Sequence, residues 1–339
     1  MSDASHQCLF ESGIDGYNTY RIPALVVSAA GTILAFCEAR KFTPGDYDTV
    51  ELFLRRSFDN GRTWAPRQLL VADGDRTCGN PCPVVDGDTI WLPFTKDNQQ
   101  VFVIHSTDDG ASWSELAEIT ASVRDPAWTY IGTGPGHGIR LQSGRLLIPS
   151  WVDEGTGPAS SDPNDSVGGV QSSYIIYSDD HGATWQHGPL LNRGVTNECE
   201  AAERTDGTVQ MTLRGIVPER RRGHSWSHDG GDTWSPVVFD DNLPQSDCQG
   251  SIITLENGTI MLAHPSDPKR RARLALYKSV DDAWSEAAVL RAGAAAYSDL
   301  AIAGDGALLC LYEYLTVPEG ESEYWDDRYA KLMLARYQP

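Results

Sequence analysis

The feature that most constrains the fold of this chain is a short segment that recurs along it. Residues 57–64 read SFDNGRTW, and the pattern S-x-D-x-G-x-[ST]-W returns at 106–113, 178–185 and 227–234. A degraded fifth copy at 279–284, SVDDAW, lacks the Gly and the Thr. The first residues of successive copies lie 49, 72, 49 and 52 residues apart, a spacing typical of β-propeller blades. The repeat therefore predicts a propeller in which four or five blades carry the segment.

The repeated carboxylate, Asp59 in the first copy, is predicted to be structural rather than catalytic. Copies of one carboxylate that recur at such intervals cannot all serve a single active site. An Asp side chain accepts hydrogen bonds from nearby backbone N–H groups and Gly tolerates positive φ, so the segment is suited to closing a hairpin turn. Residues 51–57 before it read as a strand, and Trp64 after it begins the next one.

The length of the chain fits this architecture. The 339 residues divide into six blades of about 56 residues, and long helical periodicity is absent. We therefore expect an all-β fold, a six-bladed β-propeller of four-stranded antiparallel blades, that occupies residues 1–339 as a single domain. The longest interval between copies contains the Gly-, Ser- and Asp-rich stretch 153–169. It is predicted to be a loop on a face of the propeller, where loops often line sites.

The charge of the chain limits its partners. A formal net charge of −20 at pH 7 argues against binding to nucleic acid or to an anionic membrane surface. Residues 1–10 contain neither a basic n-region nor an apolar h-region, and no run of 18 apolar residues occurs, so we expect no membrane insertion. An anionic ligand would need a local cluster of Arg to overcome the field of the whole molecule.

The seven cysteines are odd in number and scattered, a pattern typical of reduced thiols in an intracellular protein. Cys78 and Cys82 have no second Cys/His pair at zinc spacing, so we expect no metal site there. We therefore expect a cytoplasmic protein and a monomer. A secreted protein from which a signal peptide has been removed would look the same.

A second set of segments carries polar side chains beside predicted strand ends. Taken singly, each reads as a solvated surface group or a core residue. In chain order they are YRIPAL at 20–25 with Arg21, CEARKFTPGDYDTVELFLRRS at 37–57 with Arg40, Asp46 and Asp48, NECEAAE at 197–203 with Glu198, MTLRG at 211–215 with Arg214, KRRARLALY at 269–277 with Arg271, AAYSDLA at 295–301 with Tyr297, and CLYE at 310–313 with Glu313.

This ordered set, interleaved with the repeats, resembles the exo-α-sialidases (neuraminidases), particularly the short soluble type, over roughly residues 20–337. The repeated segment is similar to the Asp-box, or BNR repeat, of that superfamily. Asp-boxes also occur in binding propellers, so alone they predict architecture and not activity. The whole set in this order is what indicates a sialidase.

Two assignments within the resemblance depend on counting. In the family the general acid lies on the loop before the first Asp-box, ten residues before the second Arg of LRRS, which places it at Asp46, with Asp48 as the second choice. The family's third arginine lies three residues before a strand Leu, which gives Arg271, with Arg270 and Arg273 as alternatives.

The resemblance implies a role for each residue and requires no cofactor and no metal. One departure is Glu200, which stands where relatives often have Gln and adds a negative charge near the site. The implied catalytic residues are Asp46 as general acid, Glu198 as general base and Tyr297 as nucleophile, and the implied substrate-binding residues are Arg21, Arg214 and Arg271 on the carboxylate of the sugar, Glu313 behind Arg21, and Arg40 on the sugar hydroxyls.

Elementary chemistry supports such a set. A sialic acid carries a carboxylate on its anomeric carbon, and converging Arg side chains bind such a group through charge-assisted, partly bidentate hydrogen bonds. A carboxylate nucleophile would be repelled by that charge, whereas a neutral phenol is not, and sialidases use Tyr for this purpose. Since a phenol has a pKa near 10, it needs an adjacent base.

We therefore expect a retaining exo-α-sialidase that hydrolyses terminal α-linked sialic acids of glycoconjugates through a covalent tyrosyl–glycosyl intermediate. A trans-sialidase and a hydrolase of a related nonulosonic acid are alternatives that the sequence does not separate. A non-catalytic, glycan-binding Asp-box propeller is a third. It would be expected to lose Tyr297, Glu198 or Asp46, and all three are present.

Overall fold

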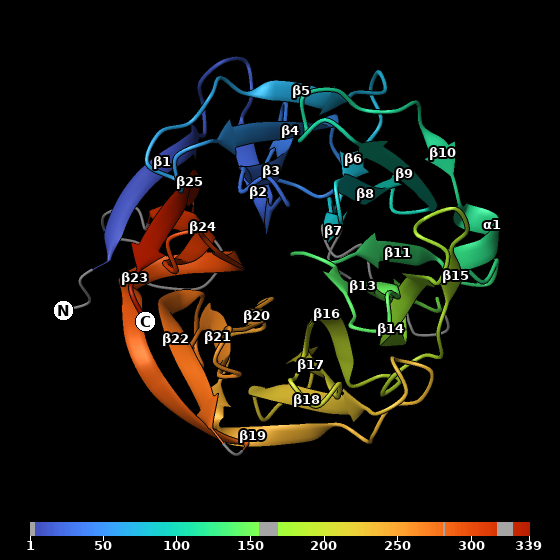
Figure 1. Cartoon of the computed structure of the whole chain (residues 1–339), viewed down its shortest axis with the longest axis vertical. Helices are drawn as coiled ribbons and strands as arrows, with labels where there is room; N and C mark the ends of the chain where they lie inside the picture. Colours follow the sequence, from blue (N-terminus) through green and yellow to red (C-terminus); the bar gives the residue numbers. More distant parts are fainter. Residues whose placement is uncertain (1–3, 156–168, 281, 317–327) are drawn as a thin grey trace.

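The computed structural model describes residues 4–155, 169–280, 282–316 and 328–339. Within these ranges the regular secondary structure consists almost entirely of antiparallel strands, and the one α-helix is a single turn, α1 (Thr120–Val123). Figure 1 shows the sheets arranged as a ring, with inner strands such as β2, β16 and β20 nearest its centre. The expectation of an all-β propeller is confirmed.

Four of the sheets are formed from consecutive strands of the chain. They contain β2 (Thr19–Val27), β3 (Ile33–Arg40), β4 (Val50–Ser57) and β5 (Gln68–Val71); β6 (Cys78–Gly79), β7 (Val84–Asp86), β8 (Thr89–Lys96), β9 (Gln100–Ser106) and β10 (Ala117–Glu118); β11 (Tyr130–Thr133), β12 (Ile139–Arg140), β13 (Leu146–Asp153), β14 (Gln171–Ser178) and β15 (Gln186–His187); and β16 (Thr196–Glu203), β17 (Val209–Gly215), β18 (Arg221–Ser227) and β19 (Val238–Pro244).

The remaining strands form one seven-stranded sheet in the order β1-β25-β24-β23-β22-β21-β20. Its long strand β23 pairs with β22 through its first part and with β24 through its second. We expect this sheet to correspond to two blades, and the count of six stays a prediction. Its strands are β1 (Ser5–Glu11), β20 (Ser251–Thr254), β21 (Ile260–Pro265), β22 (Ala272–Val280), β23 (Ala283–Ile302), β24 (Leu308–Thr316) and β25 (Arg328–Tyr337).

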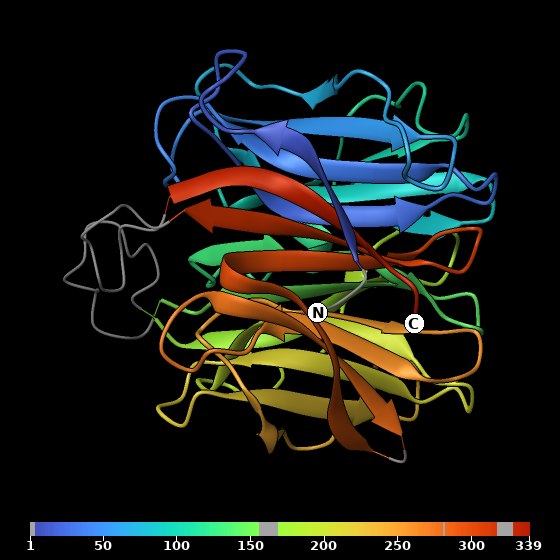
Figure 2. The same ribbon diagram turned by 90° about the vertical axis from the view of Figure 1, so that its left-hand side faces the viewer.

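The first and last strands of the chain close the ring. Strand β1 pairs antiparallel with β25, from Ser5 opposite Arg336 to Glu11 opposite Lys331. Figure 2 shows β1 (violet) beside β25 (red) on the side of the molecule. The apolar side chains of Leu9 and Phe10 on β1 are buried and pack in the same core cluster as residues of β2 and β3. The closure therefore joins the two ends of the sequence in one sheet.

The repeated segment forms the hairpin turn that its residues predict. In the first copy Asp59 Oδ1 accepts the backbone N–H of Thr63 (2.8 Å), and Asp59 Oδ2 accepts its hydroxyl (2.6 Å). Ser57 Oγ accepts the N–H of Gly61 at 2.9 Å. These hydrogen bonds, first those of Thr63, lower the pKa of Asp59 to about 2. The structural interpretation of Asp59 is confirmed, and the degraded fifth copy lies partly outside the described residues, at 281.

Two further observations concern the state of the cysteines and the possibility of a membrane-spanning helix. All seven cysteines are unpaired thiols, and all except Cys8 are buried. No helix in the described part of the chain is long and apolar enough to cross a membrane. The expectations of a cytoplasmic location, a monomer and a single domain stay predictions.

Inner strands carry buried polar groups, and this locates the site. Strand β16 is buried along most of its length although it contains Asn197, Glu198 and Glu200. Burying such groups costs free energy unless hydrogen bonds or opposite charges compensate them. Their partners therefore show what the centre of the propeller is built to do.

Candidate active site

The centre of the candidate site is a tyrosine and a glutamate from different sheets. Tyr297 of β23 donates its phenol hydrogen to Oε1 of Glu198 on β16, and both side chains are buried. Burial and then the charge of Glu198 raise the pKa of Tyr297 well above its ordinary value. The phenol is therefore neutral at rest, and a base already contacts the proton that it must lose to become a nucleophile.

Three arginines surround Tyr297, as the sequence predicts. Arg214 of β17 donates from Nη1 to Glu198 Oε2 at 2.8 Å and to the Tyr297 hydroxyl at 3.3 Å. The guanidinium carbons of Arg21 and Arg271 lie 5.3 and 5.2 Å from the centre of the Tyr297 ring. Residues that are far apart in the sequence thus place three positive charges around one phenol.

Arg21 is held in place by Glu313. Its Nε donates to Glu313 Oε1 at 3.0 Å, and Glu313 is completely buried. The same carboxylate accepts the backbone N–H of Ile22 (3.1 Å) and of Tyr297 (3.2 Å). Ile22 has a φ of +54°, which is costly for a β-branched residue and is typical of strain retained at functional sites. Glu313 therefore aligns Arg21 and Tyr297 together.

Asp46 lies on the loop between β3 and β4 and faces two arginines. Its Oδ1 is 2.7 Å from Arg40 Nη1 and 3.5 Å from Arg21 Nη1, and its side chain is 52% exposed. Desolvation raises the pKa of Asp46, but the charges of Arg40 and Arg21 outweigh it and hold that pKa below its ordinary value. The carboxylate is therefore ionised in the free protein.

Asp48, the second choice for the general acid, has a different role in the structure. It accepts the backbone N–H groups of Phe42 at 2.9 Å and Thr49 at 2.6 Å, as well as that of Thr43. These bonds hold the loop in shape, and the geometry therefore favours Asp46 for the site.

Arg40 is almost completely buried behind Asp46. Besides Asp46, its guanidinium contacts Glu38 Oε2 at 2.6 Å and the carbonyl oxygen of Pro44. It therefore positions the Asp46 loop, and the expected contact with sugar hydroxyls stays a prediction.

The choice among the three neighbouring arginines also has a geometric answer. Arg270 is exposed near Asp267, and Arg273 pairs with Glu286 at 2.7 Å away from the centre. Arg271 alone of these three contacts Tyr297 in the described structure.

Tyr329 of β25 belongs to the site, and the sequence reasoning missed it. Its hydroxyl accepts a hydrogen bond from Arg271 Nη1 at 2.9 Å, and the guanidinium carbon of Arg21 lies 4.0 Å from the centre of its ring. The ring thus joins two of the three arginines. No repeat or spacing marks this residue, and only the pairing of β25 with β24 brings it to the centre.

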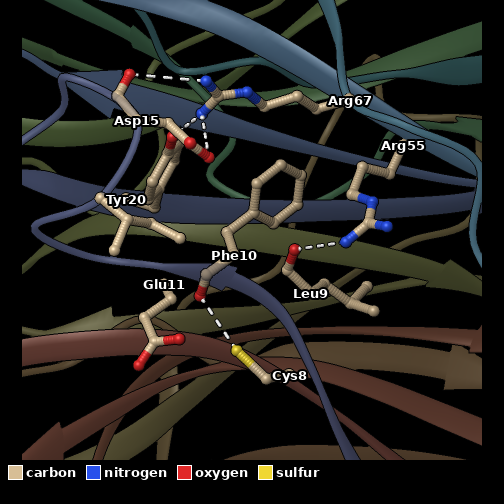
Figure 3. A pocket seen from close by; sticks show the side chains of 9 residues that line it. Cys8, Leu9, Phe10, Glu11, Asp15, Tyr20, Arg55 and Arg67 are labelled. Atoms are coloured by element: carbon tan, nitrogen blue, oxygen red, sulfur yellow. Dashed lines mark hydrogen bonds and ion pairs between the residues drawn. The ribbon is translucent and has the colours of Figure 1, made fainter.

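Part of the loop 153–169 that was expected to line the site, residues 156–168, lies outside the described residues. A cavity of about 390 Å³ lies elsewhere, between β1, β2 and β4. Figure 3 shows Tyr20, Arg55 and Arg67 among the residues that line it. The guanidinium of Arg55 already donates to the carbonyl oxygen of Leu9, and that of Arg67 pairs with Asp15. None of the candidate catalytic residues lines it.

Comparison with known proteins agrees with this geometry. The family model "BNR repeat-like domain" matches residues 23–310. Sialidase-3 of Bos taurus is 32% identical over 89% of this chain and 87% of its own length. The sialidase of Micromonospora viridifaciens is 29% identical over 91% of this chain, but the match covers 52% of that protein.

Solved structures show the same fold. The Hadza microbial sialidase Hz136 superposes with a TM-score of 0.84 at 23% identity, over 98% of this chain and 68% of its own. Trypanosoma rangeli sialidase, in complex with 2,3-difluorosialic acid as a covalent intermediate, gives a TM-score of 0.77 at 20% identity, over 99% of this chain and 58% of its own. Together with the family model and the curated relatives, these comparisons show that the chain belongs to the sialidase family of BNR-repeat propellers.

Proposed function

We propose that this protein is a retaining exo-α-sialidase that releases terminal α-linked sialic acids from glycoconjugates. The observation that carries the proposal is the contact between Tyr297 and Glu198 inside a ring of Arg21, Arg214 and Arg271. The names of the curated relatives, among them Sialidase-3 of Homo sapiens at 32% identity, support it. No cofactor or metal takes part in the scheme.

The arginines would receive the carboxylate of the substrate. Arg214 already binds the carboxylate of Glu198 and the hydroxyl of Tyr297, so an anion held by Arg21, Arg214 and Arg271 would lie against the phenol. This places the anomeric carbon, which bears that carboxylate, next to the nucleophile. A cluster of positive charge also explains how a protein with a net charge of −20 can capture an anion.

The reaction would proceed in two steps. Tyr297 attacks the anomeric carbon while Glu198 takes the phenol proton, and Asp46 gives a proton to the leaving oxygen. Asp46 then takes a proton from a water molecule that attacks the anomeric carbon, the bond to Tyr297 breaks, and Glu198 returns its proton to the Tyr297 oxygen. Two displacements at one carbon retain its configuration.

Asp46 must be protonated to act as an acid, although its two arginines favour the ionised form. The substrate resolves this conflict, because its carboxylate brings a negative charge to Arg21, one of the two cations that face Asp46. A nearby negative charge raises the pKa of a carboxyl group. Substrate binding is thus expected to prepare the general acid.

Two alternatives concern the acceptor and the sugar. The structural neighbours include intramolecular trans-sialidases, one from leech and one from Ruminococcus gnavus, but at 18% and 17% identity they share the fold alone. The same catalytic residues would serve a trans-sialidase, or a hydrolase of a related nonulosonic acid. A non-catalytic propeller would not need a base such as Glu198 in contact with the Tyr297 hydroxyl.

The test is release of the fluorophore from an aryl α-sialoside between pH 4 and 8 in the presence of EDTA. Proton NMR during the first turnovers identifies the anomer and separates free sialic acid from transfer or anhydro products. Parallel reactions use the deaminated sugar. We expect the α-anomer of the free acid, and loss of turnover in Tyr297→Phe. No release from either sugar would overturn the proposal.

A further inference from the structure

A second cluster of buried ionisable side chains lies next to the reactive pair along the same two strands. Glu200 is two residues beyond Glu198 on β16, and Asp299 is two residues beyond Tyr297 on β23. Both carboxyl groups are completely buried. His137, between β11 and β12, faces both, with its Nδ1 2.7 Å from Asp299 Oδ1 and 3.5 Å from Glu200 Oε1.

Ser251 of β20 lies between the two carboxyl groups, and its hydroxyl has too few hydrogens for its contacts. Ser251 Oγ is 2.5 Å from Glu200 Oε1 and 3.0 Å from Asp299 Oδ1, and it accepts the N–H of Leu300 at 3.0 Å. A Ser hydroxyl can donate only one hydrogen bond. If both carboxyl groups were ionised, one of these two close oxygen–oxygen contacts would have no proton between its atoms and would be repulsive. The geometry therefore indicates that one carboxyl group is protonated.

The donors around each group identify the protonated one. Asp299 accepts hydrogen bonds from the N–H of Leu25 (2.6 Å) and from His137 (2.7 Å), and it shares the N–H of Leu300 (2.9 Å) with Ser251. Apart from Ser251, Glu200 receives the N–H of Ile252 at 2.9 Å and a long contact of 3.4 Å from Gln249. Since more donors stabilise the charged form of Asp299, Glu200 holds the proton.

We propose that Glu200 is kept as a neutral carboxylic acid that donates to Ser251, and that this bond positions Glu198 against Tyr297. Electrostatics agree: burial, and then the charge of Asp299, raise the pKa of Glu200 well above its ordinary value. Burial opposes the charge of His137, but the charge of Asp299 outweighs it and raises the pKa of His137 above its ordinary value. At neutral pH the cluster is then one cation, one anion and one neutral acid.

The hydrogen bonds of Glu200 connect the two catalytic strands. One route runs from Glu200 through Ser251 to Asp299 and Leu300 of β23. The other runs through Gln249, whose Oε1 accepts the N–H of Ser298 at 3.0 Å. An ionised Glu200 would repel Asp299 and loosen both routes. This positioning role rests on the proposed function of Glu198 and Tyr297.

Neither a neighbouring ionisable group nor a bound cation takes the place of the proton on Glu200. Burial raises the pKa of three thiols that interact with Glu200, those of Cys82, Cys199 and Cys310, so they stay neutral. Glu200, Asp299 and His137 have the residue types of a cation site, but Glu200 Oε1 and Asp299 Oδ1 already accept the N–H groups of Ile252 and Leu300, and a protonated His137 cannot bind a metal through Nδ1. The ionisable groups that interact with Glu200 are Cys82, Cys199 of β16, Cys310 of β24, Arg222 of β18, His137 and Asp299.

Infrared spectroscopy at pH 7 tests the protonation directly, without any substrate. The protein is expected to show the C=O stretch of a buried, protonated carboxyl group, and Glu200→Gln is expected to remove it. Glu203→Gln, at the partly buried end of the same strand, is the matched control and leaves the band in place. Absence of the band from the native protein, or its persistence in Glu200→Gln, would overturn the proposal.

Kinetics then test the positioning role. Gln is neutral and its amide can donate to Ser251, although it then loses the hydrogen bond that Glu200 Oε1 accepts from Ile252. Glu200→Gln should therefore lower kcat several-fold less than Glu200→Ala, which should lower it by roughly tenfold or more with little change in KM. A kcat in Glu200→Gln as low as in Glu200→Ala would refute a neutral role. If the band is present but the protein cleaves no sialoside, the proposed function fails and the protonation assignment is supported.

Stability against pH provides a third measurement. Because the folded-state pKa values of Glu200 and His137 are raised, the folded protein binds more protons, and stability falls as pH rises. For Glu200 the loss begins above the ordinary pKa of 4.5, and for His137 it extends from 6.5 to about 9. The melting temperature of Glu200→Gln should therefore rise relative to the native protein between pH 4.5 and 6.5. A difference that does not change with pH would contradict a raised pKa for Glu200.

Discussion

At the scale of single residues, each charge of the candidate site has a defined partner in the free protein. Glu198 holds the proton-bearing end of Tyr297, Arg214 holds the other oxygen of Glu198, and Glu313 aligns Arg21. Such fixed partners would reduce the reorganisation that the proposed reaction requires. Arg is suited to this setting because its planar guanidinium can stack on a ring and still present donors to an anion.

The role of Arg271 can be tested by the change Arg271→Lys. An ammonium keeps the charge but loses the stacking on Tyr297 and the fork of donors that reaches Tyr329. We expect kcat/KM for an aryl α-sialoside to fall by roughly 10- to 100-fold, the equivalent of one or two charge-assisted hydrogen bonds.

The matched control for this change is Arg273→Lys, because Arg273 pairs with Glu286 outside the site. It should leave kcat/KM within about twofold of the native value, in line with the small contribution of exposed ion pairs. Equal losses in the two variants would show that position 271 has no special contact with the substrate.

At the scale of elements, the repeated turns do more than close hairpins, because some of them pack between neighbouring sheets. Gly110 in the second copy has a φ of +78°, and a Cβ there would lie 2.6 Å from Leu34 Cδ2 in the preceding sheet. The Gly of this repeat is therefore required both by its backbone conformation and by the closeness of the adjacent strand.

Gly110→Ala is predicted to destabilise the protein more than Gly207→Ala. Both residues have positive φ, but a Cβ at Gly207 would meet no atom within 4 Å. The difference in unfolding free energy should be about 1–3 kcal/mol, the usual cost of overpacking a core. Urea denaturation measures it, and equal losses in the two variants would mean that Leu34 moves aside freely.

Elements also show what the sequence can predict. The Asp-box hairpins depend on local hydrogen bonds between residues at most four apart, such as Asp59 and Thr63, so their pattern is visible in the chain. The order of the family's motifs located Tyr297, Glu198 and the three arginines, which the structure brings together. Tyr329 and the cluster of Glu200 with His137 depend on contacts between distant strands, which no local pattern records.

At the scale of the whole molecule, the ring is closed by strands from opposite ends of the chain. Pairing β1 with β25 removes two exposed sheet edges, which would otherwise invite association with other chains. The pairing also supports the site, because Tyr329 lies at the start of β25. Which distant edges pair was not predictable from the sequence, since the alternation of a strand does not identify its partner.

Removal of residues 1–11 is therefore predicted to destabilise the whole propeller. It uncovers β25 and removes Leu9 and Phe10 from the core, so we expect a lower melting temperature and concentration-dependent association by light scattering. Glu11→Gln, which removes only the surface ion pair with Lys331, is the control and should behave as the native protein does. A truncated protein with unchanged melting temperature would show that closure contributes little.

The most direct test of the account is to identify the residue that becomes glycosylated. The protein is incubated with a 2,3-difluorinated sialosyl fluoride, which slows the second step, then denatured, digested and analysed by mass spectrometry. The account predicts one sugar adduct per chain on Tyr297, and none in Tyr297→Phe. An adduct on Glu198 or Asp46, or turnover of sialosides without any adduct under these conditions, would contradict it.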